Sequence, residues 1–335
     1  MRICILGAGG LGSVFGALLA KQGVDITLIG RAAHVNAINE KGLQLLGIRG
    51  EQLIKENLTA VTDARDARGE FDYLILGVKS TATAATLAGA NCLRDRVATA
   101  FSFQNNIVKE TELATWLGDP ARVIGFSTFE GGFLEAPGRV NNNITLETSS
   151  YLGELDGTTT ARTTELTETL NSAGIGTRLV PNIQQVLWEK LTQIANAAGW
   201  SISCEIGNPA LTFADAMILR EGAEHYLAVA REVLSVYKAQ GYQPQNFYAP
   251  VSKLKELDSL DDEAAITTIM GIGQAMLDGG YQSRTSMHDD ILNGKKTEVD
   301  YILKPFIDKA AELGLEVPTV AACYRIIKVL DNYLR

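Results

Sequence analysis

Short apolar runs of strand length alternate with helical patterns through the first half of the chain. The runs are RICILG, DITLIG, DYLILGV, VATAFS and RVIGFST, and apolar periodicity predicts helices over 13–22 and 34–41. Strands that alternate with helices are typical of a parallel sheet covered on both faces. The stretch 139–155 predicts antiparallel strands, and a helix is expected over 160–172. The first half is therefore expected to be an α/β domain built on a parallel sheet.

Beyond Pro181 the pattern changes to helices alone. Periodicity predicts helices over 183–198, 215–239 and 262–277, and then two more separated by the segment GLEVP. Asp261 or Asp262 is a natural N-cap for the third helix. We therefore expect an α/β domain over residues 1–180 and an all-α domain over 181–335.

A lysine interrupts the apolar side of the helix predicted over 183–198. At about 100° per residue, Lys190 falls within the stripe formed by Ile183, Val186, Leu187, Leu191 and Ile194. An unpaired ammonium in apolar surroundings costs on the order of several kcal/mol. Lys190 is therefore expected either to extend into water or to face a polar cleft.

Composition and charge exclude several classes of partner. The 335 residues carry 30 Lys+Arg against 39 Asp+Glu, a net charge of −9, which gives no general attraction for nucleic acid or anionic membranes. The four cysteines are scattered, which indicates a reducing, cytoplasmic compartment. There is no signal-peptide pattern and no apolar run of about 18 residues. No histidine has a partner at metal-ligand spacing, so no metal is expected.

A glycine-rich loop follows the first predicted strand. Gly7, Gly9 and Gly12 form G-x-G-x-x-G between a strand and a helix, with Gly10 and Leu11 inside the loop. The first glycine permits a tight turn, the second lets a pyrophosphate approach the backbone, and the third allows close packing of helix on strand. We predict a dinucleotide site here; the alternative is that the glycines serve only the turn.

The end of the second strand distinguishes the two nicotinamide dinucleotides. A site for NAD usually has a carboxylate there for the ribose 2′-hydroxyl, whereas this chain has Arg31. A guanidinium can pair with a 2′-phosphate through two hydrogen bonds, so we expect NADP(H). The alternative is a solvent-exposed surface arginine.

Two further loops follow predicted strands. Lys79 comes after DYLILGV, where the carboxyl end of a parallel strand meets the cofactor crevice, and Asn105 lies in the loop after VATAFS. An amide in such a loop can bind the cofactor, but asparagine is also a routine turn residue. Both readings of Asn105 are open.

A second constellation lies near the C-terminus, in SRTSMHDDILNGKKTEVDYI. If the stretch after Gly294 is helical, Glu298 lies in its first turns, beside an apolar face. A solvated carboxylate near a helix N-terminus is the alternative, because such a charge is favourable in itself. Ser286 precedes Glu298 in the same segment.

The motifs together resemble those of the ketopantoate reductase (2-dehydropantoate 2-reductase) family. ILGAGGLGSVFGALLAKQG, Arg31, GVKS, FQNN, LWEKL and SMHDDILNGKKTEVDYI occur in that family's order and cover nearly the whole chain. The resemblance implies a Rossmann domain followed by a helical domain like that of 6-phosphogluconate dehydrogenase, with the active site in the cleft between them. It also implies NADPH-dependent reduction of a 2-oxo acid to a 2-hydroxy acid.

The resemblance assigns roles to individual residues. The lysine of the W-x-K segment falls on Lys190, the general acid, and the glutamate that pairs with or orients it falls on Glu298. Ser286 and Asn208 match substrate-contacting residues, and Asn105 matches an asparagine beside both cofactor and substrate.

Two departures from the family pattern concern the substrate. Asparagines four and eight residues after the lysine are replaced by Ile194 and Ala198, and Asn106 replaces a loop glycine. Of the nearest amides, Gln193 lies about 60° from the lysine around the helix and is the better placed to substitute in part, whereas Asn196 lies about 120° away. The pocket is therefore expected to be more apolar than that of a pantoate-forming enzyme.

Three functions are open from the sequence. The first is a 2-oxo acid reductase of ketopantoate reductase type. The second is a D-2-hydroxyacid dehydrogenase of the same family acting on a bulkier or aromatic substrate, and the third is a non-catalytic NADP(H)-binding sensor. Arg284 is a further candidate donor to a substrate carboxylate. By analogy with other helical domains, a homodimer would cover an exposed apolar face of the second half.

Overall fold

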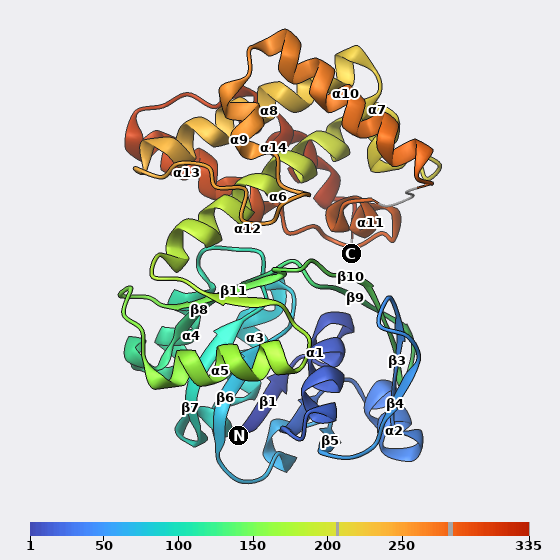
Figure 1. Ribbon diagram of the computed structural model, residues 1–335, viewed down its shortest axis with the longest axis vertical. Helices are drawn as coiled ribbons and strands as arrows, with labels where there is room; N and C mark the ends of the chain where they lie inside the picture. The colour runs from blue at the N-terminus through green and yellow to red at the C-terminus, as the bar shows by residue number, and fades with distance from the viewer. Residues whose placement is uncertain (206–207, 281–283, 335) are drawn as a thin grey trace. The chain divides into compact units, whose positions relative to one another are not determined.

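The computed structural model describes residues 1–205, 208–280 and 284–334 (Figure 1). The chain forms two compact units, Met1–Leu187 and Trp188–Arg335, and each is described by itself. The division falls within one long helix, a little beyond the boundary expected at Pro181.

A parallel sheet forms the centre of the first unit. Its strands are β1 (Arg2–Leu6), β2 (Asp25–Ile29), β5 (Leu58–Val61), β6 (Phe71–Leu76) and β7 (Val97–Ser102), in the spatial order β5-β2-β1-β6-β7. Every neighbouring pair is parallel. The chain builds outward from β1 through β2 to β5, then crosses to β6 on the other side. The point where the order reverses lies between β1 and β6, and this arrangement confirms the predicted Rossmann-like fold.

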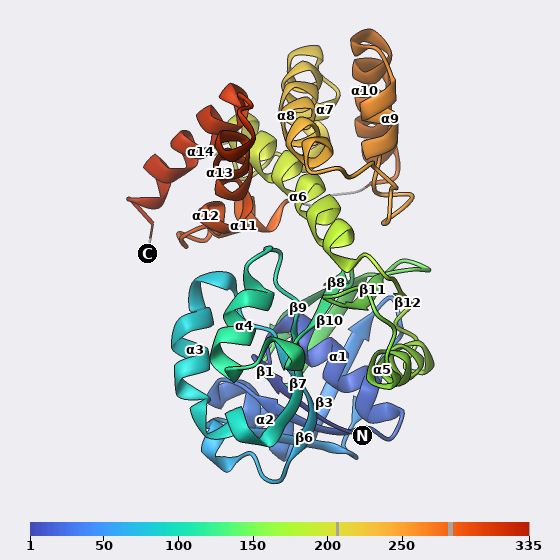
Figure 2. The same cartoon turned by 90° about the vertical axis from the view of Figure 1, so that its left-hand side faces the viewer.

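Helices cover both faces of this sheet because alternate strand residues point to opposite faces. Ile3 and Ile5 of β1 belong to one apolar cluster, together with residues of α1 (Gly10–Lys21), α2 (Ala32–Lys41) and α5 (Ala161–Ser172). Cys4 and Leu6 belong to another, with residues of α3 (Thr83–Gly89) and α4 (Lys109–Leu117). Figure 2 shows α3 and α4 on one side of the sheet and α1 and α5 on the other.

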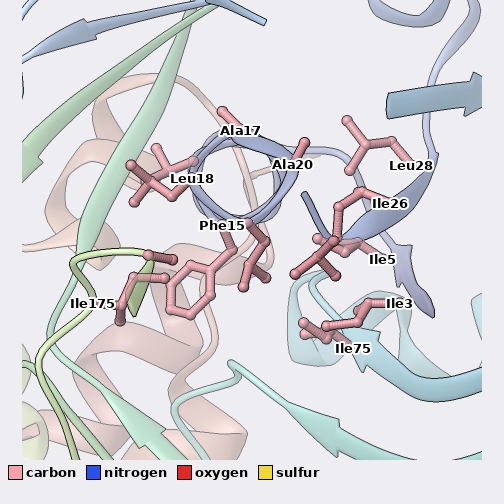
Figure 3. Packing of buried hydrophobic residues seen from close by; sticks show 14 of the residues in the cluster. Ile3, Ile5, Phe15, Ala17, Leu18, Ala20, Ile26, Leu28, Ile75 and Ile175 are labelled. Carbon is pink, nitrogen blue, oxygen red and sulfur yellow. The ribbon is translucent and has the colours of Figure 1, made fainter. Parts of the chain in front are cut away.

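The helix α1 is the centre of the first cluster. Figure 3 looks along its axis and shows the Phe15 ring next to Ile175, while Ile5 and Ile26 of the neighbouring strands lie on another side of the helix. Residues 12–20 of α1 are all buried. A helix apolar on every side is expected where a sheet covers it on one face and further structure on the other.

Two smaller sheets complete the first unit. One contains β3 (Leu43–Gly47), β4 (Gln52–Ile54), β9 (Gly131–Ala136) and β10 (Arg139–Ile144), and the other β8 (Ile124–Thr128), β11 (Ser150–Glu154) and β12 (Thr177–Leu179). The 3₁₀ helices of this unit are η1 (Ala64–Asp66), η2 (Ser80–Ala82), η3 (Asn91–Arg96) and η4 (Pro120–Arg122).

The strands expected over 139–155 do not pair with each other. β10 is antiparallel to β9, and β11 is antiparallel to β8, in different sheets. The strands β3, β4 and β5 were not predicted, because they are short and only partly buried.

The second unit is helical in its described residues, as predicted. Its elements are α6 (Ile183–Glu205), which starts in the first unit, and α7 (Phe213–Met217), α8 (Arg220–Ala239), α9 (Leu254–Ser259), α10 (Asp262–Asp278), α11 (Ser286–Leu292), α12 (Val299–Ile302), α13 (Lys304–Leu313) and α14 (Pro318–Asp331). The Asp261 carboxylate accepts a hydrogen bond from the Ala264 N–H at 2.9 Å, which confirms this N-cap. Within the part of the chain that the structure covers, no helix has both the length and the apolar character needed to cross a bilayer.

The prediction of a single helix over 215–239 was wrong. The chain forms α7 and α8 instead, with Leu219 in an extended conformation between them. Gly222 packs so closely on α7 that a Cβ at this position would lie 1.9 Å from the Ala216 carbonyl oxygen. The break thus lets α8 start against the end of α7.

Two adjacent glycines at the start of α1 provide a test of packing. A Cβ at Gly10 would lie 2.2 Å from the Gly132 carbonyl oxygen of β9, whereas a Cβ at Gly9 would meet nothing within 4 Å. We expect Gly10→Ala to destabilise the protein by about 2 kcal/mol, because backbone has to move. Gly9→Ala should change stability by less than about 1 kcal/mol. Thermal and urea unfolding of both variants measure this difference, and equal stability would contradict it.

Candidate active site

The residues predicted to bind a dinucleotide follow four neighbouring strands. Gly7 follows β1, Arg31 follows β2, Lys79 follows β6 and Asn105 follows β7. Since β2, β1, β6 and β7 are adjacent and parallel, their carboxyl ends lie along one edge of the sheet. The structure therefore brings these four sequence positions to the same edge.

The glycine loop has the backbone geometry that its sequence predicts. Gly7 has φ +117°, and a Cβ at Gly12 would lie 2.3 Å from the Gly7 carbonyl oxygen, so the turn and the helix packing both require glycine. Gly9 is the N-cap of α1, and the space around it is open. The tight turn at Gly7 and the close packing at Gly12 are the roles that the sequence predicted, and the open space at Gly9 leaves room for the predicted pyrophosphate.

The start of α1 presents unpaired backbone donors. The first helical hydrogen bond runs from the Ser13 N–H to the Gly9 carbonyl at 3.0 Å. The N–H groups of Gly10, Leu11 and Gly12 precede it and have no acceptor within the helix. Such groups, beside open space at Gly9, form a site that suits a phosphate.

Arg31 is exposed at the N-terminus of α2. The buried His34 of the same helix fixes the position of this helix start. The Gly138 N–H donates to His34 Nδ1 at 2.9 Å, so Nε2 carries the ring proton and donates to Ser13 Oγ at 3.0 Å. Burial lowers the pKa of His34, in keeping with a neutral ring. The helix start is thus fixed against α1 while the guanidinium of Arg31 is accessible to a ligand.

Two of the three side-chain amides in the loop after β7 donate hydrogen bonds to the segment that follows β6. Gln104 Nε2 donates to Thr83 Oγ1 at 2.6 Å, and Asn106 Nδ2 donates to Ser80 Oγ at 2.9 Å. The half-buried Asn105 side chain makes no hydrogen bond to the described part of the protein. Asn105 therefore has its amide available, whereas Asn106 braces the loop where the family pattern has glycine. Lys79 is exposed.

Lys190 does not extend into water. Its side chain is only 8% exposed on α6, and Nζ lies 5.9 Å from the centre of the Tyr248 ring. The structure therefore rejects the alternative of a lysine that reaches into solvent.

The residue before Lys190 has a role that sequence reasoning missed. Glu189 is buried, and its carboxylate accepts hydrogen bonds from the Gln245 and Phe247 N–H groups, at 2.8 and 3.0 Å, and from the Tyr237 hydroxyl at 2.9 Å. Burial raises the pKa of Glu189, and these donors oppose the shift. A glutamate directly before a lysine on the apolar face of a helix could have suggested that Glu189 has a structural role. Nothing in the sequence indicated that Tyr248 contacts Lys190.

The remaining predicted residues lie elsewhere in the second unit. Glu298 is half-buried and immediately precedes α12, so it occupies the N-cap position of that helix and does not lie within it. Ser286 is exposed at the start of α11, and Asn208 is exposed, with its side-chain oxygen accepting from the Ala210 N–H at 3.0 Å.

Arg284 connects the two segments that carry Ser286 and Asn208. Its guanidinium donates to the Leu211 carbonyl at 2.9 Å and to the Pro209 carbonyl. These bonds join the start of α11 to the loop after α6. Two of the guanidinium nitrogens of Arg284, a candidate donor to a substrate carboxylate, are therefore bound to backbone carbonyls.

The positions that depart from the family pattern differ in exposure. Ile194 and Gln193 are half-buried, and Ala198 is buried. Asn196 is buried beside the Tyr226 hydroxyl, whose pKa burial raises to about 12. Asn196 therefore lies against Tyr226 of α8.

His288 is buried against the end of α6. Its Nδ1 lies 3.1 Å from Glu205 Oε2, and burial lowers the pKa of His288 and raises that of Glu205 to about 7. Within residues 1–205, 208–280 and 284–334, no three His, Cys, Asp or Glu side chains are arranged to hold a metal.

Comparison with known proteins identifies relatives over nearly the whole chain. Residues 3–157 match the family model described as ketopantoate reductase PanE/ApbA, and residues 182–331 match its C-terminal counterpart. The 2-dehydropantoate 2-reductase of Pyrococcus abyssi is 31% identical, over 98% of this chain and 97% of the relative.

Solved structures share the fold. A 2-dehydropantoate 2-reductase from Geobacter metallireducens superposes with a TM-score of 0.80 at 22% identity, over 98% of this chain and 99% of that one. A D-mandelate dehydrogenase with NADH and anilino(oxo)acetate gives 0.75 at 20% identity, over 99% of each chain. The two family models together cover most of the sequence, and the chain therefore belongs to the ketopantoate reductase family of oxidoreductases.

Proposed function

We propose that this protein reduces a 2-oxo acid to the corresponding 2-hydroxy acid with NADPH, with Lys190 as the general acid. The observation that carries the proposal is the buried Lys190, which lies in the W-x-K segment of a ketopantoate reductase family member. A charged side chain with so little exposure, on an apolar helix face, suits proton transfer better than solubility.

The residues at the sheet edge fit NADP(H). The open backbone at Gly9 and the N–H groups of α1 suit the pyrophosphate, and the exposed Arg31 suits a 2′-phosphate. Asn105 has an amide available for the ribose or the carboxamide. Lys79 adds a positive charge at the same edge of the sheet.

Substitution of Arg31 tests the choice of dinucleotide. Arg31→Glu should weaken NADPH binding by about 10²-fold, because two charge-assisted hydrogen bonds to the 2′-phosphate are lost. NADH binding should change far less. Arg178→Glu, at an exposed position on β12, is the matched control. Titrations of both cofactors by fluorescence measure the effect, and equal losses for NADPH and NADH would refute the assignment.

The proposed mechanism requires a cation and a proton at the substrate carbonyl oxygen. The reduced nicotinamide, when bound, supplies hydride to the carbonyl carbon. The ammonium of Lys190 stabilises the negative charge that develops on the oxygen and then donates a proton to it. Glu298 would pair with or orient Lys190, and Ser286 and Asn208 would donate to the substrate carboxylate.

Replacement of Lys190 tests its role. Lys190→Ala should lower kcat by at least about 10²-fold, since both the cation and the proton donor are lost. Lys255→Ala, which removes an exposed lysine on α9, should leave kcat unchanged. Steady-state kinetics at matched protein concentrations compare kcat of the two variants with that of the native protein. An undiminished kcat in Lys190→Ala removes this residue from the mechanism.

The substrate is proposed to be more apolar than ketopantoate. Ile194 is half-buried and offers methyl and methylene groups, and the buried Ala198 brings no amide, at positions where amides would otherwise bind substrate. An aliphatic 2-oxo acid larger than ketopantoate or an aromatic one would suit such a surface. This supports, as a second candidate, a D-2-hydroxyacid dehydrogenase acting on a bulkier substrate.

A substrate panel separates these functions. Ketopantoate, branched aliphatic 2-oxo acids and an aryl 2-oxo acid are compared by NADPH oxidation, for the native protein and for Ile194→Asn. We expect the apolar acids to give the higher kcat/KM, and Ile194→Asn to shift the ratio toward ketopantoate. Turnover confined to ketopantoate would contradict the apolar surface, and cofactor binding without any turnover would favour an NADP(H)-binding sensor.

A further inference from the structure

Two consecutive side chains of α6 engage the same loop between α8 and α9. Glu189 accepts hydrogen bonds from the backbone N–H groups of Gln245 and Phe247. Lys190 lies under the ring of Tyr248, the next residue of that loop. Two adjacent residues of α6 therefore contact both the backbone of this loop and the side chain of its Tyr248.

The contacts of Glu189 leave the loop little freedom. Its two carboxylate oxygens receive three hydrogen bonds of 2.8 to 3.0 Å, one of them from the hydroxyl of Tyr237 on α8. Since Glu189 is 2% exposed, water does not compete for these donors. The Tyr248 carbonyl in turn accepts from the Ser252 N–H at 2.9 Å, which fixes the chain on its other side.

The ring of Tyr248 is well placed to hold an ammonium group. Tyr248 is 1% exposed and Lys190 is 8% exposed, so little of either residue is in contact with water. The negative face of an aromatic ring attracts a cation within about 6 Å of its centroid, and more strongly where water is excluded. The observed distance is 5.9 Å.

We propose that Tyr248 is a positioning residue that holds the ammonium of Lys190 through its ring face, and that Glu189 anchors the loop that presents this ring. The inference rests on the proposed role of Lys190 as general acid. A lysine is a point charge on a flexible four-carbon stem, so a fixed contact at its end decides where the proton is delivered. Small displacements of a catalytic group are costly to the rate.

A spectroscopic experiment tests the contact without any need for turnover. In full-length protein carrying lysine labelled with ¹³C at Cε, the Lys190 signal is assigned by its loss in Lys190→Ala. A group over a ring face is shifted upfield, so we expect an upfield Lys190 signal in the native protein and in Tyr248→Phe. In Tyr248→Leu the shift should vanish.

Two further variants sharpen this test. Glu189→Gln, which puts an N–H₂ group where an acceptor is needed, should reduce the upfield shift with Tyr248 still present. Tyr242→Leu is the matched control, because it removes another tyrosine ring of the same loop, one that packs on Tyr237 with 5.3 Å between centroids. An unshifted Lys190 signal in the native protein would overturn the proposal, and a full shift in Glu189→Gln would overturn the role of Glu189.

Kinetics of the same variants test the consequence for catalysis. With the best substrate of the panel, Tyr248→Leu should lower kcat by about 10-fold, with little change in KM, while Tyr248→Phe keeps most of kcat. Equal losses in Tyr248→Phe and Tyr248→Leu would assign the effect to the hydroxyl and contradict the ring contact. If Lys190→Ala lowers kcat and Tyr248→Leu does not, the positioning role fails but the general acid stands. If Lys190→Ala has full activity, the proposed function itself fails.

Discussion

Two side chains of opposite charge, Glu189 and Lys190, are buried next to each other on α6, and both contact the loop after α8. Glu189 and Lys190 are both less than a tenth exposed, and a charge removed from water needs partners. Glu189 obtains them by binding the backbone of the loop after α8, and that loop delivers the Tyr248 ring to Lys190. The need to satisfy one carboxylate therefore shapes the surroundings of the neighbouring ammonium.

A different constraint governs the first unit, where strand direction alone gathers the polar residues. Buried parallel strands offer few places for charged groups along their length, so the residues that can bind a ligand lie where the strands end. The loop after β7 shows how such an edge is stabilised. Gln104 and Asn106 bind Thr83 and Ser80, which leaves Asn105 with its amide available. Rigid neighbours thus support a residue that can bind a ligand.

Much of this arrangement could be predicted from the sequence, because glycine loops and strand-helix alternation depend on local rules. The parallel sheet, the helical second half and the turn at Gly7 follow from periodicity and spacing. The break between α7 and α8 depends on the close approach of Gly222 to Ala216, which no local pattern reports. The same holds for Tyr248: its contact with Lys190 depends on hydrogen bonds to Glu189 from far along the chain. Tertiary partners of buried charges were the part that sequence reasoning could not supply.

The central claim is that Lys190 protonates a 2-oxo acid whose reduction uses NADPH. A crystal structure of the protein with NADP⁺ and a 2-oxo acid tests it most directly. The account predicts the 2′-phosphate on Arg31 and the substrate carbonyl oxygen within about 3.2 Å of Lys190 Nζ. A carbonyl oxygen bound by another side chain, with Lys190 directed away from the substrate, would contradict it.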